Sequence, residues 1–109
     1  RLELNNGNVS FADDATVTVS SVINTAAIVA VSAQKDNNGS TSYPSGLFWV
    51  DYDTSTIVEL ADCSGRFATS DTDNQICIYK NANSTDFTVK NRTGYTNVIT
   101  INIIALKGA

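Results

Sequence analysis

The chain has 109 residues, and its seven basic and eleven acidic residues give a net charge of −4. This length predicts one domain, residues 1–109, that buries a sizeable core without a metal or disulfide staple. Binding to a nucleic-acid duplex needs a dense basic patch, so no nucleic-acid partner is expected. Histidine is absent, which removes the usual general base and the commonest zinc ligand. We therefore expect no enzyme activity and no cofactor.

The longest apolar run, Ala26–Val31, is far shorter than the roughly 20 residues that a membrane-spanning helix needs. No signal peptide is visible, and no membrane insertion is expected. The first residue is Arg1 rather than Met, which indicates a processed product or an excised fragment. The Lys107–Ala109 ending follows an apolar segment and is expected to be a natural end.

In chain order, alternation of polar and apolar residues dominates, and no stretch has the period of a long amphipathic helix. Thr16–Ser20 alternates like a half-buried strand, whereas Ala26–Ala33 and Leu47–Tyr52 are apolar on both faces. Further strands are expected at Thr56–Leu60, Gln75–Tyr79, Thr85–Lys90 and Asn97–Leu106, with weaker candidates at Val9–Ala12 and Arg66–Thr69.

The connectors between these segments are rich in Asn, Asp, Gly, Ser and Thr. An Asn-Gly pair within Asn5–Asn8 predicts a tight turn. The longest connector, Asp36–Gly46, holds the only proline, and Asp71–Asn74, Asn81–Ser84 and Arg92–Thr96 close hairpin-like gaps. About eight or nine short strands at this spacing predict an all-β fold, an antiparallel β-sandwich of jelly-roll-like type.

Three strands carry more apolar residues than a monomeric sandwich needs, since one face of each sheet should meet water. These are Ala26–Ala33, Leu47–Tyr52 and Ile99–Leu106. Self-association, or a parent assembly, is expected to bury the second face. The alternative is a curved sheet whose own loops cover that face.

Two cysteines, Cys63 and Cys77, leave two alternatives open. They are either two buried thiols or one disulfide across neighbouring strands. No CxxC motif and no other soft ligand is present, so neither a metal site nor a redox site is expected.

Carboxylates cluster at Asp13-Asp14, Asp51–Asp53 and Asp71–Asn74. Such loop oxygens are able to bind Ca²⁺, but none of these segments has the twelve-residue calcium-loop pattern. Turn chemistry, in which Asp and Asn side chains bond nearby backbone, is the favoured interpretation. Glu59 is the only carboxylate inside an apolar strand, and it is expected to meet solvent.

Aromatic residues offer candidates for recognition. Either Phe48 or Trp49 is expected in the core, with the other on the opposite face of the strand. Tyr43 in the proline-bearing loop and Tyr95 beside Gly94 are better contact candidates, because tyrosine combines a large rigid surface with a polar tip. The alternative is that both are ordinary surface tyrosines.

Pro44–Asp51 (PSGLFWVD) and Thr56–Ala61 (TIVELA) resemble the middle of small β-sandwich modules in bacteriophage tail fibres and related virion proteins. Gln75–Tyr79 (QICIY) and Asp86–Gly108 are similar to the C-terminal ends of those modules, where a Gly-bearing polar turn leads into a last apolar strand. The resemblance spans Ala26–Gly108. It implies a jelly-roll-like sandwich, usually trimeric, that is a structural part of the virion and contacts host glycans or proteins.

The expected function is thus a non-enzymatic virion module, a homotrimeric tail-fibre tip that binds the host surface through loops. Its expected partners are other virion proteins and a host glycan or protein. A capsid decoration protein and a calcium-assisted carbohydrate-binding module are the alternatives. The residues expected to contact a ligand are Tyr43, Ser45, Arg92 and Tyr95. Arg92 is also expected to pair with a carboxylate across a subunit contact.

Overall fold

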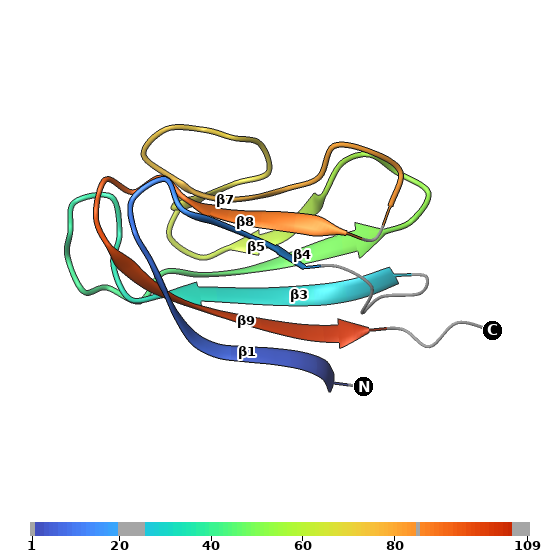
Figure 1. Ribbon diagram of the computed structural model, residues 1–109, viewed down its shortest axis with the longest axis horizontal. Coiled ribbons are helices and arrows are strands. Elements are labelled where there is room, and N and C mark those ends of the chain that lie inside the picture. The colour runs from blue at the N-terminus through green and yellow to red at the C-terminus, as the bar shows by residue number, and fades with distance from the viewer. Residues whose placement is uncertain (1, 20–25, 85, 106–109) are drawn as a thin grey trace.

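The computed structural model describes residues 2–19, 26–84 and 86–105, and for residues 2–9 and 105 it describes the backbone only. Within these ranges nine strands and no helix form two facing sheets (Figure 1). This confirms the predicted all-β sandwich. The strands are β1 (Leu2–Phe11), β2 (Thr16–Val19), β3 (Ala26–Ala33), β4 (Ser45–Asp51), β5 (Val58–Asp62), β6 (Phe67–Ala68), β7 (Ile76–Tyr79), β8 (Phe87–Asn91) and β9 (Asn97–Ala105).

One sheet has five antiparallel strands in the order β1-β9-β3-β4-β5, and the other has four in the order β2-β8-β7-β6. The last strand, β9, lies between β1 and β3, which places distant parts of the chain side by side. The prediction of purely antiparallel pairing is wrong at one place, because β6 pairs parallel to β7. There the segment between the two strands returns the chain to the starting end of the sheet.

The core fills the space between the sheets, and every second residue of the long strands points into it. Fully buried positions alternate along β3 and β9, and β4 contributes Phe48 and Val50. The rings of Phe48 and Phe67 lie 5.6 Å apart at 57° and join the two sheets. Phe48 is buried while Trp49 is half-buried on the outer face, so the prediction of one ring on each face is confirmed.

The first strand corrects the sequence prediction at Asn5–Asn8, where a tight turn was expected. β1 runs unbroken from Leu2 to Phe11, beyond the expected Val9–Ala12 strand. Asn5 pairs with Asn102 and Asn8 with Thr100, so β1 has one more residue than β9 over this stretch. The polar Asn-Gly segment is therefore a β-bulge and not a turn. In a β-bulge one strand carries an extra residue that is left unpaired.

Other boundaries shift by a few residues. The expected strand Thr56–Leu60 lies at Val58–Asp62, with a register irregularity opposite Leu47 and Phe48. Glu59 is exposed, as expected. The expected strand ends Ser20, Thr85 and Leu106 lie outside the described residues.

The outer faces of the two sheets differ in chemistry. On the four-stranded sheet, Thr18 pairs with Thr88 and Thr16 with Lys90, a polar face suited to water. On the five-stranded sheet, Ile28 pairs with both Trp49 and Ile104. Apolar side chains of this face remain open to solvent, with exposed fractions of 42% for Leu47, 49% for Val58, 51% for Leu60 and 44% for Ile104. The loops therefore do not cover these four side chains.

We predict that Phe48→Ala lowers the free energy of unfolding by about 3–5 kcal/mol, because it leaves a cavity where the sheets meet. The control is Tyr52→Ala, which truncates an aromatic ring that is 60% exposed and is expected to cost within about 0.5 kcal/mol. Urea unfolding of both variants measures the difference. Equal costs would contradict the placement of Phe48 in the core.

Candidate functional site

The two loops expected to contact a ligand lie at the same end of the sandwich. Loop 34–44 and turn 92–96 meet at the left of Figure 1, whereas the start of β1 and the end of β9 lie at the opposite end. Asn97 joins the loops, since its Nδ2 donates to the Lys35 carbonyl (2.8 Å) and its Oδ1 accepts from the Lys35 amide (2.9 Å). We call this region the loop end.

A buried carboxylate orders loop 34–44. Asp36 is 4% exposed, and its Oδ1 accepts from the backbone amides of Asn38 (2.8 Å) and Ser40 (3.2 Å). Its Oδ2 accepts from Ser42 Oγ (2.8 Å) and lies 3.7 Å from the Arg66 guanidinium. These hydrogen bonds, led by that of Asn38, hold the pKa of Asp36 below its ordinary value of 3.8. These polar contacts thus fix the course of the loop.

Tyr43 and Ser45 lie together where this loop enters β4. Tyr43 is 63% exposed and has a left-handed φ of +50°, which is uncommon for a residue with a side chain. Its amide donates to the Gln34 carbonyl (3.2 Å). Ser45 Oγ lies 3.2 Å from the Tyr43 carbonyl and 3.1 Å from Ser32 Oγ. Ser45 therefore positions the backbone of Tyr43 against β3.

Tyr95 supports the neighbouring loop. A Cβ built on Gly39 would lie 2.9 Å from Tyr95 Cε1, so the ring packs directly on the glycine backbone. Gly39 also has a φ of +77°, which a side chain would strain. The Tyr95 ring is 42% exposed and leaves part of its surface open at the loop end.

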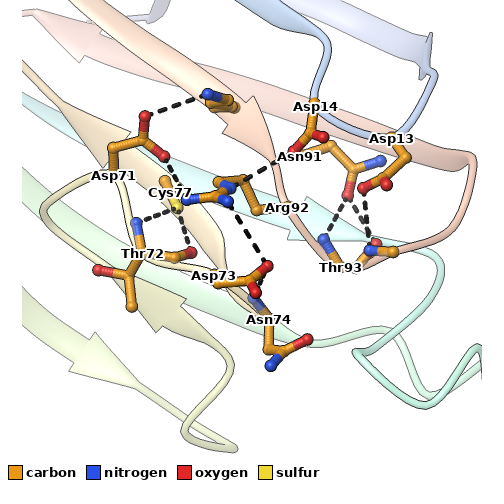
Figure 2. Close-up of polar contacts among 12 residues, drawn as sticks. Asp13, Asp14, Asp71, Thr72, Asp73, Asn74, Cys77, Asn91, Arg92 and Thr93 are labelled. Carbon is orange, nitrogen blue, oxygen red and sulfur yellow. Dashed lines mark hydrogen bonds and ion pairs between the residues drawn. The ribbon is translucent and has the colours of Figure 1, made fainter.

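Asn91 is a second buried polar centre (Figure 2), and sequence reasoning did not single it out. It is fully buried, and its Nδ2 donates to the carbonyls of Tyr95 (2.7 Å), Phe11 (3.2 Å) and Ala12 (3.2 Å). Its Oδ1 accepts from the amide (3.2 Å) and hydroxyl (2.7 Å) of Thr93. The only local signal is the Asn-x-Thr spacing of a polar turn, because Phe11 lies 80 positions away.

Arg92 points into a group of carboxylates of its own chain (Figure 2). Its guanidinium lies 3.1 Å from Asp71, 3.4 Å from Asp14 and 3.6 Å from Asp73. Lys90 Nζ donates to Asp71 at 3.1 Å, and this bond, together with the charge of Arg92, lowers the pKa of Asp71. Within the chain, Arg92 thus ties turn 12–15 and segment 70–75 to β8. The expected pairing across a subunit contact stays a prediction.

Segment 70–75 also covers the thiol of Cys77. Cys77 is buried, accepts from the Thr72 amide at 3.4 Å and donates to its carbonyl at 3.2 Å, while Cys63 is exposed. Both cysteines are free. The alternative of a disulfide is therefore wrong, and the alternative of two buried thiols holds for Cys77 alone. Burial raises the pKa of the Cys77 thiol.

The carboxylate clusters act in turns, as favoured from the sequence. Asp51 accepts from the Asp53 amide (2.8 Å) and Asp73 from the Asn74 amide (3.0 Å). Asp13 differs, because it accepts from the Gly94 amide (3.0 Å), 81 positions away. Among the side chains that the structure describes, in residues 10–19, 26–84 and 86–104, no three His, Cys, Asp or Glu are grouped so as to hold a metal ion. No helix in those ranges is long and apolar enough to cross a membrane.

The loop end thus presents a phenol ring, hydroxyls and amides on a framework fixed by Asp36 and Asn91. Tyr43 and Ser45 lie close together, and Tyr95 lies across the adjoining loop. Arg92, at the end of β8, pairs with several carboxylates of its own chain. These groups offer hydrogen bonding and ring contact.

We predict that acid destabilises the fold partly through Asp36. Because the pKa of Asp36 is lower in the folded chain than the ordinary 3.8, its contribution is present above that value and is lost as pH falls through the folded pKa. In Asp36→Asn, the melting temperature should be lower at neutral pH and fall less steeply below about pH 4. The control Asp53→Asn changes an exposed turn carboxylate. Parallel acid profiles for wild type and Asp36→Asn would refute this role.

We also predict that the Cys77 thiol does not react with Ellman's reagent in the folded protein and that both thiols react in denaturant, because Cys77 is buried. Cys63→Ser should therefore leave no fast reaction in the folded protein. Rapid reaction of both thiols in the folded protein would show that segment 70–75 does not cover Cys77.

Comparison with known proteins gives no family assignment. No protein-family model, curated protein or solved structure matches this chain. The chemistry of the loop end is therefore inferred from its own residues.

Proposed function

We propose that this chain is a non-enzymatic structural module of a virion, a homotrimeric tail-fibre tip that binds the host surface through its loop end. One observation carries the proposal, namely the apolar outer face of the five-stranded sheet. The resemblance of Pro44–Asp51 and Asp86–Gly108 to tail-fibre modules supports it, as does the sandwich fold itself.

The apolar face has the character of an assembly surface. Register pairing aligns Ile104, Ile28, Trp49 and Val58 in one row across β9, β3, β4 and β5. Leu47 and Ala61 extend it in the next row. The outer face of the four-stranded sheet carries threonines instead. An apolar outer face is therefore specific to the five-stranded sheet. Contiguous exposed apolar surface of this kind marks an interaction site.

The sheet face is comparable in size to one side of a standard interface. Five strands spaced about 4.8 Å apart, with about eight residues at 3.3 Å each, give a sheet face of roughly 600 Å² before side-chain relief is counted. Standard interfaces bury about 800 Å² of accessible surface per partner. A neighbouring copy seated on the apolar part of this face would therefore need further contacts beside it to form a standard interface.

The two ends of the sandwich suit a fibre tip. β1 begins and β9 ends at one end of the sandwich (Figure 1). Loop 34–44, turn 12–15 and turn 92–96 lie at the other end. A stalk joined at the first end would leave the loop end free to meet a receptor. Binding residues are commonly carried on loops that a rigid scaffold positions.

We predict a solution mass of about three times the 11.6 kDa of the chain by light scattering at low micromolar concentration, unchanged by EDTA. Leu47→Lys places a charge on this face, beside the row of Ile28 and Trp49, and should shift the mass toward that of the monomer.

Thr16→Lys is the matched control, because it adds the same charge at an exposed strand position on the other sheet, and it should leave the mass unchanged. A monomeric wild type would contradict the trimeric tip. An oligomer that Leu47→Lys leaves intact would show that a different surface makes the contact.

A further inference from the structure

Beside Tyr43, the surface is hollowed into a depression of about 350 Å³. It forms where β3 and β9 meet loop 34–44. Its lining residues are Ser32, Ala33, Gln34, Tyr43, Val98 and Thr100.

The chemistry of this lining is neutral and mixed. Hydroxyls of Ser32, Thr100 and Tyr43 and the amide of Gln34 both donate and accept hydrogen bonds, and Val98 adds apolar surface. The side chain of Ala33 is buried in the core. None of the six lining side chains is a carboxylate, an ammonium or a guanidinium. A ligand that matches this lining is itself uncharged, rich in hydroxyls, and has an aliphatic face to lay against an aromatic ring.

The aromatic wall of the depression is held in place. The left-handed φ of Tyr43 is unfavourable and persists only where the surroundings impose it. Here the Tyr43 amide bonds Gln34 and the Ala33 amide donates to the Pro44 carbonyl at 3.0 Å, so both residues are anchored to the end of β3. Because the backbone of Tyr43 and Pro44 is already held in place, a ligand would not have to order it. A small entropy cost of ordering favours affinity.

The exposure of Tyr43 is the feature that folding leaves unexplained. Its ring is 63% exposed, so core packing does not account for a bulky residue at a strained position where glycine would fit without strain. Strained backbone of this kind clusters at ligand-binding sites.

We propose that the depression is a subsite for one neutral sugar ring, with the ring of Tyr43 against the aliphatic face of the pyranose. Ser32, Gln34 and Thr100 bond its hydroxyls. Positively polarised C–H groups meet the negative face of an aromatic ring favourably. This inference rests on the proposed receptor-binding function and names the ligand class of the loop end.

A second hollow on the same sheet has a different character. It is lined by Ala30, Leu47, Ala61 and the exposed Cys63, among others, and its surface is mainly apolar. That hollow belongs to the apolar face assigned to assembly. Ser32, Ser45 and Asn102 also line it, but its exposed surface is almost wholly apolar, which suits a sugar poorly.

The test is binding of neutral monosaccharides, namely glucose, galactose, mannose and their N-acetyl amines, by saturation-transfer NMR at millimolar concentration, followed by an array of neutral and acidic glycans. At least one neutral sugar should bind. Tyr43→Ala should weaken binding about three- to tenfold, the range expected for one aromatic contact. Tyr52→Ala is the matched control, because that ring is 60% exposed outside the depression, and it should bind like wild type.

Tyr43→Gly separates binding from folding. Glycine adopts the left-handed conformation freely, so the melting temperature should stay the same or rise while sugar binding falls. A loss of binding in Tyr43→Gly with an intact fold supports the subsite. Binding that does not depend on Tyr43, or a preference for acidic glycans, overturns it.

The solution mass and host-cell binding distinguish the two proposals. A trimer that binds host cells without binding any neutral sugar overturns the sugar subsite alone. A monomer that neither binds cells nor sugars overturns the receptor-binding function together with its ligand. Binding of a host protein at Tyr43, with no sugar competing, also overturns the sugar subsite.

Discussion

The two-residue period of the β-strand is the constraint on which the rest of this structure depends. Burial of Ile99, Ile101 and Ile103 in the core forces every intervening residue of β9 onto the outer face. The same holds in β3 and β4, so the core fixes which side chains meet solvent. The core does not require apolar residues in the outer row. Polar residues are compatible with outward positions, as the threonines of β2 and β8 show.

At the loop end the organising force changes from apolar burial to buried hydrogen bonds. Asp36 and Asn91 are each nearly or fully buried, and each satisfies several backbone groups that no strand pairs. A buried polar group without partners is costly, so such a network tolerates few alternative loop shapes. This explains how a segment rich in Asn, Ser and Gly presents side chains in a fixed arrangement.

Periodicity alone located β2, β3, β7, β8 and β9 closely, because each buries one face of a regular strand. It failed at β1, where an Asn-Gly pair serves a bulge as readily as a turn, and local sequence does not distinguish the two. The sequence pattern also located the candidate loops 34–44 and 92–96. It did not predict the contacts within them. The partners of Arg92 include Asp14, 78 positions away, and only the meeting of β8 with the first turn brings them together.

Along the outer face of the five-stranded sheet, polarity rises row by row toward the loop end. The row of Ile104, Ile28 and Trp49 is apolar, the row of Asn102, Ala30 and Leu47 is mixed, and the row of Thr100, Ser32 and Ser45 bears only hydroxyls. Because register fixes these rows, assembly and recognition need not compete for the same surface. A neighbouring copy seated on the apolar row would lie toward the end where β1 begins, and the hydroxyl row beside Tyr43 would remain open to a ligand.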